Sequence, residues 1–138
     1  MYKFSMPIGD WSDDGHGKCE YFIVKSNKPV EEVREIHFQI KEKTGVNIEE
    51  LCSEYEDNTI FVDDLEEIEE LGFDISNIET HDGKASLYPT DMLNLWVFLL
   101  CKTDETLKLE IEDTPEMLSF YGFDYKGRHI GFVGYGCF

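Results

Sequence analysis

The chain has 138 residues, of which 41% are hydrophobic and 14% aromatic, a composition typical of a folded globular protein rather than a disordered one. Its formal net charge is −18, because 30 acidic residues outnumber 12 basic ones. This excess of acid argues against direct binding of nucleic acid or of an anionic membrane surface, since both require clustered Lys and Arg.

The N-terminal part is predicted to be a β-hairpin followed by a long helix. Tyr2–Ile8 alternates in part between polar and apolar residues, and Cys19–Lys25 is rich in β-branched and aromatic residues, so we expect two strands joined by a long polar loop. Pro29–Thr44 has one apolar stripe at three- and four-residue steps, which predicts a helix that ends at Gly45. His37 lies on this stripe and is expected to be a buried residue with satisfied hydrogen bonds.

Two shorter helices are predicted in the middle of the chain. The pattern of residues 47–50 resembles a capping box and favours a helix over Ile48–Tyr55. A second helix is expected to have Asp63 or Asp64 as its cap and to run through Leu71, before a glycine that stops it.

A strand before the second of these helices, and an ambiguous segment and a buried helix after it, are also predicted. Thr59–Val62 is a strand candidate, and Ile75–Ser86 contains a His-Asp-Gly turn that fits either a hairpin or a loop. Met92–Cys101 is apolar almost all round, so we expect a deeply buried helix there, capped by Thr90 or Asp91.

The last part of the chain completes a mixed pattern. Thr106–Glu112 alternates strictly and predicts a half-buried strand, residues 115–121 a short helix, and His129–Phe138 a final strand. Regular alternation of strands and helices is absent, which favours an α+β fold. We expect one domain, residues 1–138, with a mostly antiparallel sheet of about four to six strands and about three to five helices packed on it.

The negative charge is concentrated in one segment. Residues 44–83 contain 14 Asp and Glu and no Lys or Arg. In the helix predicted there, apolar residues would face inward, so the carboxylates would line the outer face, where a negative field attracts cationic partners. The alternative is that this face is only solvated. The carboxylates are Asp63, Asp64, Glu66, Glu67, Glu69 and Glu70.

These carboxylates suggest a docking surface for a basic protein. Electrostatic complementarity raises association rates, but affinity also requires an apolar anchor, for which Tyr55, Phe61 and Phe73 are candidates if they are exposed. We therefore expect a small non-enzymatic binding protein that inhibits a basic partner, and imitation of nucleic-acid charge is one way in which it would do so. The partner would be a toxin, as for an immunity protein, or a nucleic-acid-processing enzyme, as for an anti-defence inhibitor from a phage or mobile element.

A second hypothesis concerns the segment that starts at Asp10. Oxygen-bearing side chains alternate over residues 10–14 and a glycine follows, as in the opening of a Ca²⁺-binding loop. The pattern departs from such loops at its last position, where Tyr21 replaces the bidentate Glu. A divalent-metal-binding protein or metal-dependent enzyme would use Asp10, Asp14 and His16. The alternative is a tight turn in which these oxygens accept backbone N–H groups.

Other motifs point to no enzyme class. The sequence lacks the usual nucleophile, phosphate-loop, dinucleotide and zinc-protease motifs, and its four cysteines form no C-x-x-C pair. No signal peptide is visible, and the longest apolar run is only Leu95–Cys101, so we expect a cytoplasmic protein with free thiols. Oligomeric state is left open.

Overall fold

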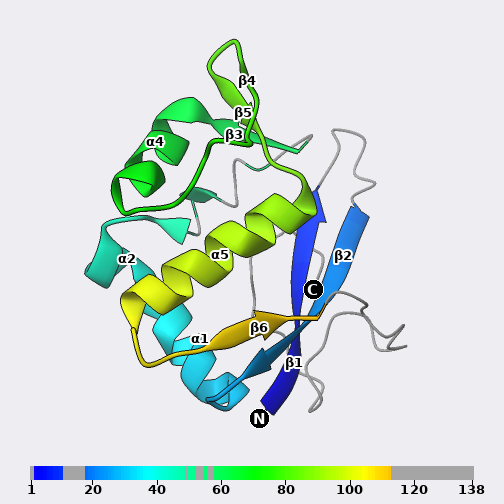
Figure 1. Ribbon diagram of the computed structural model, residues 1–138, viewed down its shortest axis with the longest axis vertical. Coiled ribbons are helices and arrows are strands. Elements are labelled where there is room, and N and C mark those ends of the chain that lie inside the picture. Colours follow the sequence, from blue (N-terminus) through cyan, green and yellow to red (C-terminus); the bar gives the residue numbers. More distant parts are fainter. Residues whose placement is uncertain (1, 11–17, 49, 52–54, 56–57, 113–138) are drawn as a thin grey trace.

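The computed structural model describes residues 2–10, 18–48, 50–51, 55 and 58–112 (Figure 1). These residues form an α+β fold with two antiparallel three-stranded sheets, as the mixed pattern predicted, although the strands are divided between two sheets. The first sheet consists, in order, of β1 (Tyr2–Asp10), β2 (Lys18–Ser26) and β6 (Leu109–Ile111), and the second of β3 (Thr59–Phe61), β5 (Lys84–Ser86) and β4 (Thr80–His81).

The first sheet is the predicted hairpin with one added strand. β1 and β2 pair in register from Tyr2 opposite Ser26 to Asp10 opposite Lys18, and β6 joins β2 on its other side. One face of this sheet contributes Phe4, Met6 and Val24 to the core.

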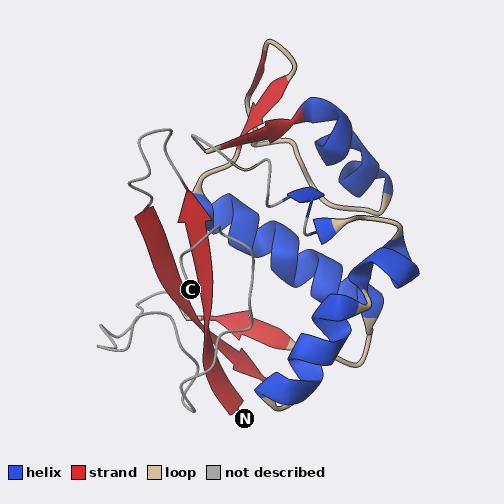
Figure 2. Ribbon diagram, turned by 180° about the vertical axis from the view of Figure 1, so that it is seen from behind, coloured by secondary structure: helices blue, strands red, loops and turns tan. Residues whose placement is uncertain are grey.

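The helix α5 (Pro89–Thr103) is the centre of the molecule. Six of its side chains are buried, and it packs against β1, α1 (Val30–Phe38) and α2 (Ile40–Thr44). Figure 2 shows β1 and β2 on one side of α5 and the helix α2 on the other. Among the described residues, no helix is both long and apolar enough to cross a membrane.

The helix predicted as continuous over Pro29–Thr44 is divided into α1 and α2 at Gln39. The Gln39 N–H donates to the carbonyl of Ile36, three residues back, at 3.0 Å. This tighter turn interrupts the α-helical ladder while both Ile36 and Ile40 remain buried. The stop at Gly45 is confirmed, with a left-handed φ of 81°.

Two predicted helix caps are wrong. The helix α4 (Val62–Glu70) has Phe61 as its N-cap, so Asp63 and Asp64 lie inside its first turn. The helix α5 begins at Pro89, whose fixed φ suits a first position, and Asp91 lies at its third position instead of capping. The Asp91 carboxylate accepts a hydrogen bond from the backbone N–H of Tyr88, the N-cap residue, at 3.0 Å.

The ambiguous segment Ile75–Ser86 contains the hairpin of β4 and β5. Its two central turn residues, Asp82 and Gly83, have positive φ values of 50° and 78°, as a tight hairpin turn requires. Residues 48 and 50–51 of the predicted helix Ile48–Tyr55 are helical. The predicted helix 115–121 and strand His129–Phe138 lie outside the described residues.

Candidate functional site

The helix α4 has the two faces that its sequence predicted. Leu65 and Ile68 are buried against the core, and Leu71, just after the helix, is half-buried. The carboxylates therefore lie on the outer face, where five are exposed and Asp64 is half-buried. This outer surface of α4, called the acidic face below, consists of Asp63, Asp64, Glu66, Glu67, Glu69 and Glu70.

The acidic face has no cation to balance it among the described residues. None of its carboxylates forms an ion pair there, and the last turn of α4 contains no basic residue. Lysines elsewhere do find acidic partners: Lys3 and Lys25 both contact Glu112, at 2.9 and 3.4 Å, and Lys28 contacts Asp104 at 3.6 Å.

The end of α4 is fixed by backbone geometry. Gly72 has a φ of 109°, its N–H donates to Glu69 at 2.8 Å, and the N–H of Phe73 donates to Ile68 at 3.4 Å. This pair of bonds is a Schellman motif, which satisfies carbonyls that the helix leaves open. Phe73 is half-buried and its ring lies 5.3 Å from that of Phe98, so part of this anchor candidate already belongs to the core.

Tyr55 is not an exposed anchor, which corrects the prediction. Its side chain is 1% exposed, and its hydroxyl donates to the carbonyl of Leu87 at 2.7 Å. The ring contributes to the core, and the hydroxyl satisfies a buried carbonyl 32 residues away.

Phe61 is the candidate anchor that the structure leaves accessible. Its side chain is 49% exposed, on the outer face of the second sheet, whereas Ile60 and Ala85 face the core. Lys84 lies directly opposite in the neighbouring strand, and its Nζ is 5.4 Å from the centroid of the Phe61 ring. Phe61 precedes α4 immediately, so this ring lies at one end of the acidic face.

Sequence reasoning missed a second exposed ring near this sheet. Tyr88 is 64% exposed, just before α5. Residues 84–87 alternate between exposed polar residues and the buried apolar residues Ala85 and Leu87. Tyr88 occupies the next exposed position of this alternation. That alternation was the signal that could have placed Tyr88 on the outer face.

His37 is a structural residue, as predicted. Its Nδ1 accepts a hydrogen bond from the indole N–H of Trp96 at 3.0 Å, and the imidazole is 2% exposed. Burial lowers the pKa of His37 to about 4, so the ring is neutral at pH 7.

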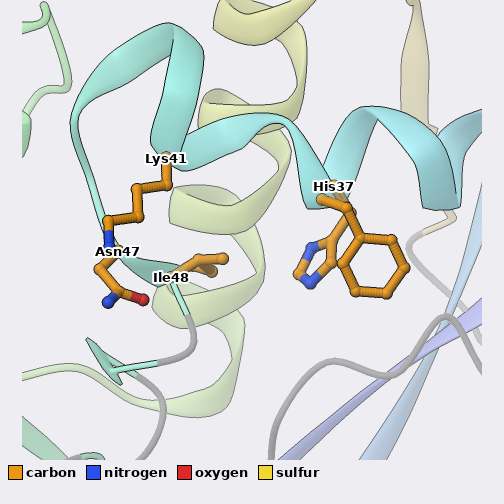
Figure 3. Close-up of a pocket in the computed structure, with 5 residues that line it drawn as sticks. His37, Lys41, Asn47 and Ile48 are labelled. Carbon is orange, nitrogen blue, oxygen red and sulfur yellow. The ribbon is translucent and has the colours of Figure 1, made fainter.

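A pocket of about 170 Å³ lies beside His37 (Figure 3). Lys41 and Asn47 lie at one end of the pocket and His37 at the other, with Ile48 between them. Phe38 also lines it. The amide oxygen of Asn47 accepts from the Glu50 N–H at 3.1 Å, so its role is to cap the turn that follows. The described residues that line the pocket include no nucleophile paired with a base.

The metal hypothesis falls mainly on residues outside those described. Asp14 and His16 belong to the undescribed segment, and Asp10 is the last residue of β1. Within the described part of the chain, no three His, Cys, Asp or Glu side chains are grouped as metal ligands would be. The contact between His81 and Asp82, 3.1 Å at the tip of the β4–β5 hairpin, is almost fully exposed.

Among the cysteines, Cys101 is a free thiol packed against the core, as predicted. Burial raises the pKa of this thiol, which makes it a poor nucleophile at neutral pH.

Comparison with known proteins gives no assignment: no protein family matches the sequence, and no curated protein or solved structure is significantly similar to it.

Proposed function

We propose that this protein binds a basic partner protein through the acidic face of α4 and inhibits that partner by occupying its Lys/Arg surface. The observation that carries the proposal is the acidic face itself, whose carboxylates lie together on one exposed helix side without an ion-pairing cation among the described residues. Such a surface is complementary to a groove that binds phosphate.

The arrangement of charge in α4 costs stability, which favours a role in binding. Carboxylates four residues apart, such as Glu66 and Glu70, repel each other by a few tenths of a kcal/mol. Glu69 and Glu70 also lie at the C-terminal end, where the helix dipole favours cations. The helix α2 follows the usual rule, with Lys41 and Lys43 in its last turn.

The proposed mechanism is occlusion. The acidic face would fill a cationic groove that otherwise holds a nucleic-acid backbone, and the exposed ring of Phe61 would supply the apolar contact at its end. The partner class that fits this chemistry is a nucleic-acid-processing enzyme, either a toxin neutralised by an immunity protein or a host defence enzyme blocked by an inhibitor. Binding would weaken steeply with salt, because exposed charges are screened within about 10 Å at 0.1 M.

The test compares two variants with equal changes in net charge. The first replaces the acidic face by amides (Asp63→Asn, Asp64→Asn, Glu66→Gln, Glu67→Gln, Glu69→Gln and Glu70→Gln). The matched control replaces six acidic residues outside α4, chosen on other elements and turns (Glu32→Gln, Glu35→Gln, Glu42→Gln, Glu79→Gln, Glu105→Gln and Glu110→Gln).

Native protein and both variants would be used to capture proteins from host lysate, and the captured protein would then be purified. The proposal expects the purified partner to bind the native protein and the control variant but not the acidic-face variant, and to lose its nucleic-acid binding when the native protein is added. Equal binding by the acidic-face variant would contradict the proposal and make the acidic face a solvated surface.

A further inference from the structure

The ring of Phe61 is held at a fixed place beside the first turn of α4. Phe61 is both the last residue of β3 and the N-cap of α4, with an extended backbone at φ −70° and ψ 140°. Its neighbour Ile60 is buried and pairs with Ala85, which sets the strand register and turns the Phe61 ring to the outer face. The ring therefore needs no rearrangement to meet a partner.

This ring already has a cation on its face. The Lys84 ammonium lies 5.4 Å from the ring centroid, within the range over which the ring quadrupole attracts a positive charge. Within the described part of the chain, Lys84 forms no ion pair, although Asp63 and Asp64 follow Phe61 by two and three residues. The outer face of Phe61 is thus a position that suits a cationic side chain.

A carboxylate of the acidic face follows Phe61 by three residues at the start of α4. Phe61 is the N-cap of α4 and Asp64 is its third helical residue, a separation of three at which two residues are neighbours on a helix surface. Asp64 is the half-buried member of the acidic face, so its charge is less screened than those of its neighbours.

An arginine side chain matches this pair of groups better than a lysine does. A planar guanidinium stacks on an aromatic face and still directs N–H donors from its edge to a carboxylate, whereas an ammonium is a compact point charge with a stronger hydration shell. We propose that Phe61 and Asp64 form a subsite for an arginine of the basic partner, and that this arginine displaces Lys84 from the ring. This inference rests on the proposed function and specifies the partner chemistry at one end of the acidic face.

The subsite is tested with two peptide probes of equal length and charge, hexa-arginine and hexa-lysine, titrated into the native protein at low salt by calorimetry. A cation on an exposed ring contributes modestly to affinity. We therefore expect the ratio of hexa-arginine affinity to hexa-lysine affinity to be about threefold larger in the native protein than in Phe61→Leu. Phe38→Leu is the matched ring control, since Phe38 is 65% exposed on α1, and it should keep the native ratio.

Lys84→Gln provides a second measurement. Removal of the competing ammonium should strengthen hexa-arginine binding more than Lys102→Gln does, a control that makes the same change in net charge on α5. Circular dichroism of each variant checks that the fold is retained.

The outcomes separate the subsite from the function on which it rests. If the arginine-to-lysine affinity ratio is the same in the native protein and in Phe61→Leu, or if Lys84→Gln and Lys102→Gln behave alike, the subsite is wrong while the acidic face keeps its proposed role. If the acidic-face amide variant binds both peptides as tightly as the native protein, the proposed function itself fails.

Discussion

Replacing Glu70 by Lys should stabilise the protein while weakening its binding to a basic partner. Glu70 is the last residue of α4 and is exposed, four residues after Glu66, which is exposed as well. The change turns a repulsive i, i+4 pair into a Glu-to-Lys pair in the favourable orientation. It also places a cation at the helix end where the dipole had disfavoured a carboxylate.

The expected gain follows from these two effects. Reversing the side-chain pair contributes about 0.5 kcal/mol, and reversing the charge at the helix end contributes a similar amount for an exposed site, so the free energy of unfolding should rise by about 1 kcal/mol. For a chain of this size, that corresponds to a rise in Tm of about 4 °C. Urea denaturation at low salt and thermal unfolding by circular dichroism would measure both quantities.

A matched control separates local effects from relief of the overall negative charge. Glu105→Lys makes the same change in net charge at an exposed turn between α5 and β6. Glu70→Lys should stabilise the protein more than Glu105→Lys does, and the difference should shrink at 1 M salt, where charges are screened within about 3 Å. A Glu70→Lys variant no more stable than this control would refute the idea that the acidic face is maintained at the expense of stability.

Three further predictions concern the core and one turn. Burial holds the pKa of His37 at about 4, below about 6.5 in an unfolded chain, so the unfolded state binds the proton first. The free energy of unfolding should therefore fall by up to about 3 kcal/mol as the pH is lowered from about 6.5 to about 4. In urea titrations, the unfolding free energy of His37→Gln, whose amide oxygen can still accept from Trp96, should depend less on pH. An equal dependence on pH in both proteins would contradict the assignment of this effect to His37. Tyr55→Phe should cost about 1 to 2 kcal/mol in urea denaturation, because the buried carbonyl of Leu87 loses its donor; no loss would mean that another donor replaces it. Gly83→Ala should lower the Tm, because its φ of 78° strains any other residue, although space around it is open; an unchanged Tm would show that the turn relaxes.

Much of the secondary structure was predictable because its signals are local. The hairpin of β1 and β2, the core of α5 and the two faces of α4 all follow from residue periodicity over short windows. Helix starts were less predictable. Asp63 and Asp91 both have the chemistry of a cap, yet each lies inside its helix, because Phe61 and Tyr88 already have the extended backbone of a cap residue.

The candidate site was predictable in its charge and not in its anchors. The outer-face position of the six carboxylates was predicted correctly because Leu65 and Ile68, three residues apart, mark the buried side of one helix. Tyr55 and Phe61 looked equivalent in the sequence, but Tyr55 is enclosed by segments far away in the chain, and its hydroxyl meets a carbonyl 32 residues on. No local pattern around Tyr55 showed that its ring packs inward, whereas the alternation of residues 84–88 did point Tyr88 outward.

The sequence by itself determined the concentration of negative charge and the side of α4 that carries it, because a helical period is set by hydrogen bonds between residues only four apart. The tertiary structure alone decided where Lys84 and Phe61 meet and how His37 finds Trp96, 59 residues away. Strand register and helix packing bring such residues together, and both depend on the burial of apolar surface across the whole fold. The acidic character of the candidate site is therefore a property of its sequence, whereas the cation position beside it is a property of the fold.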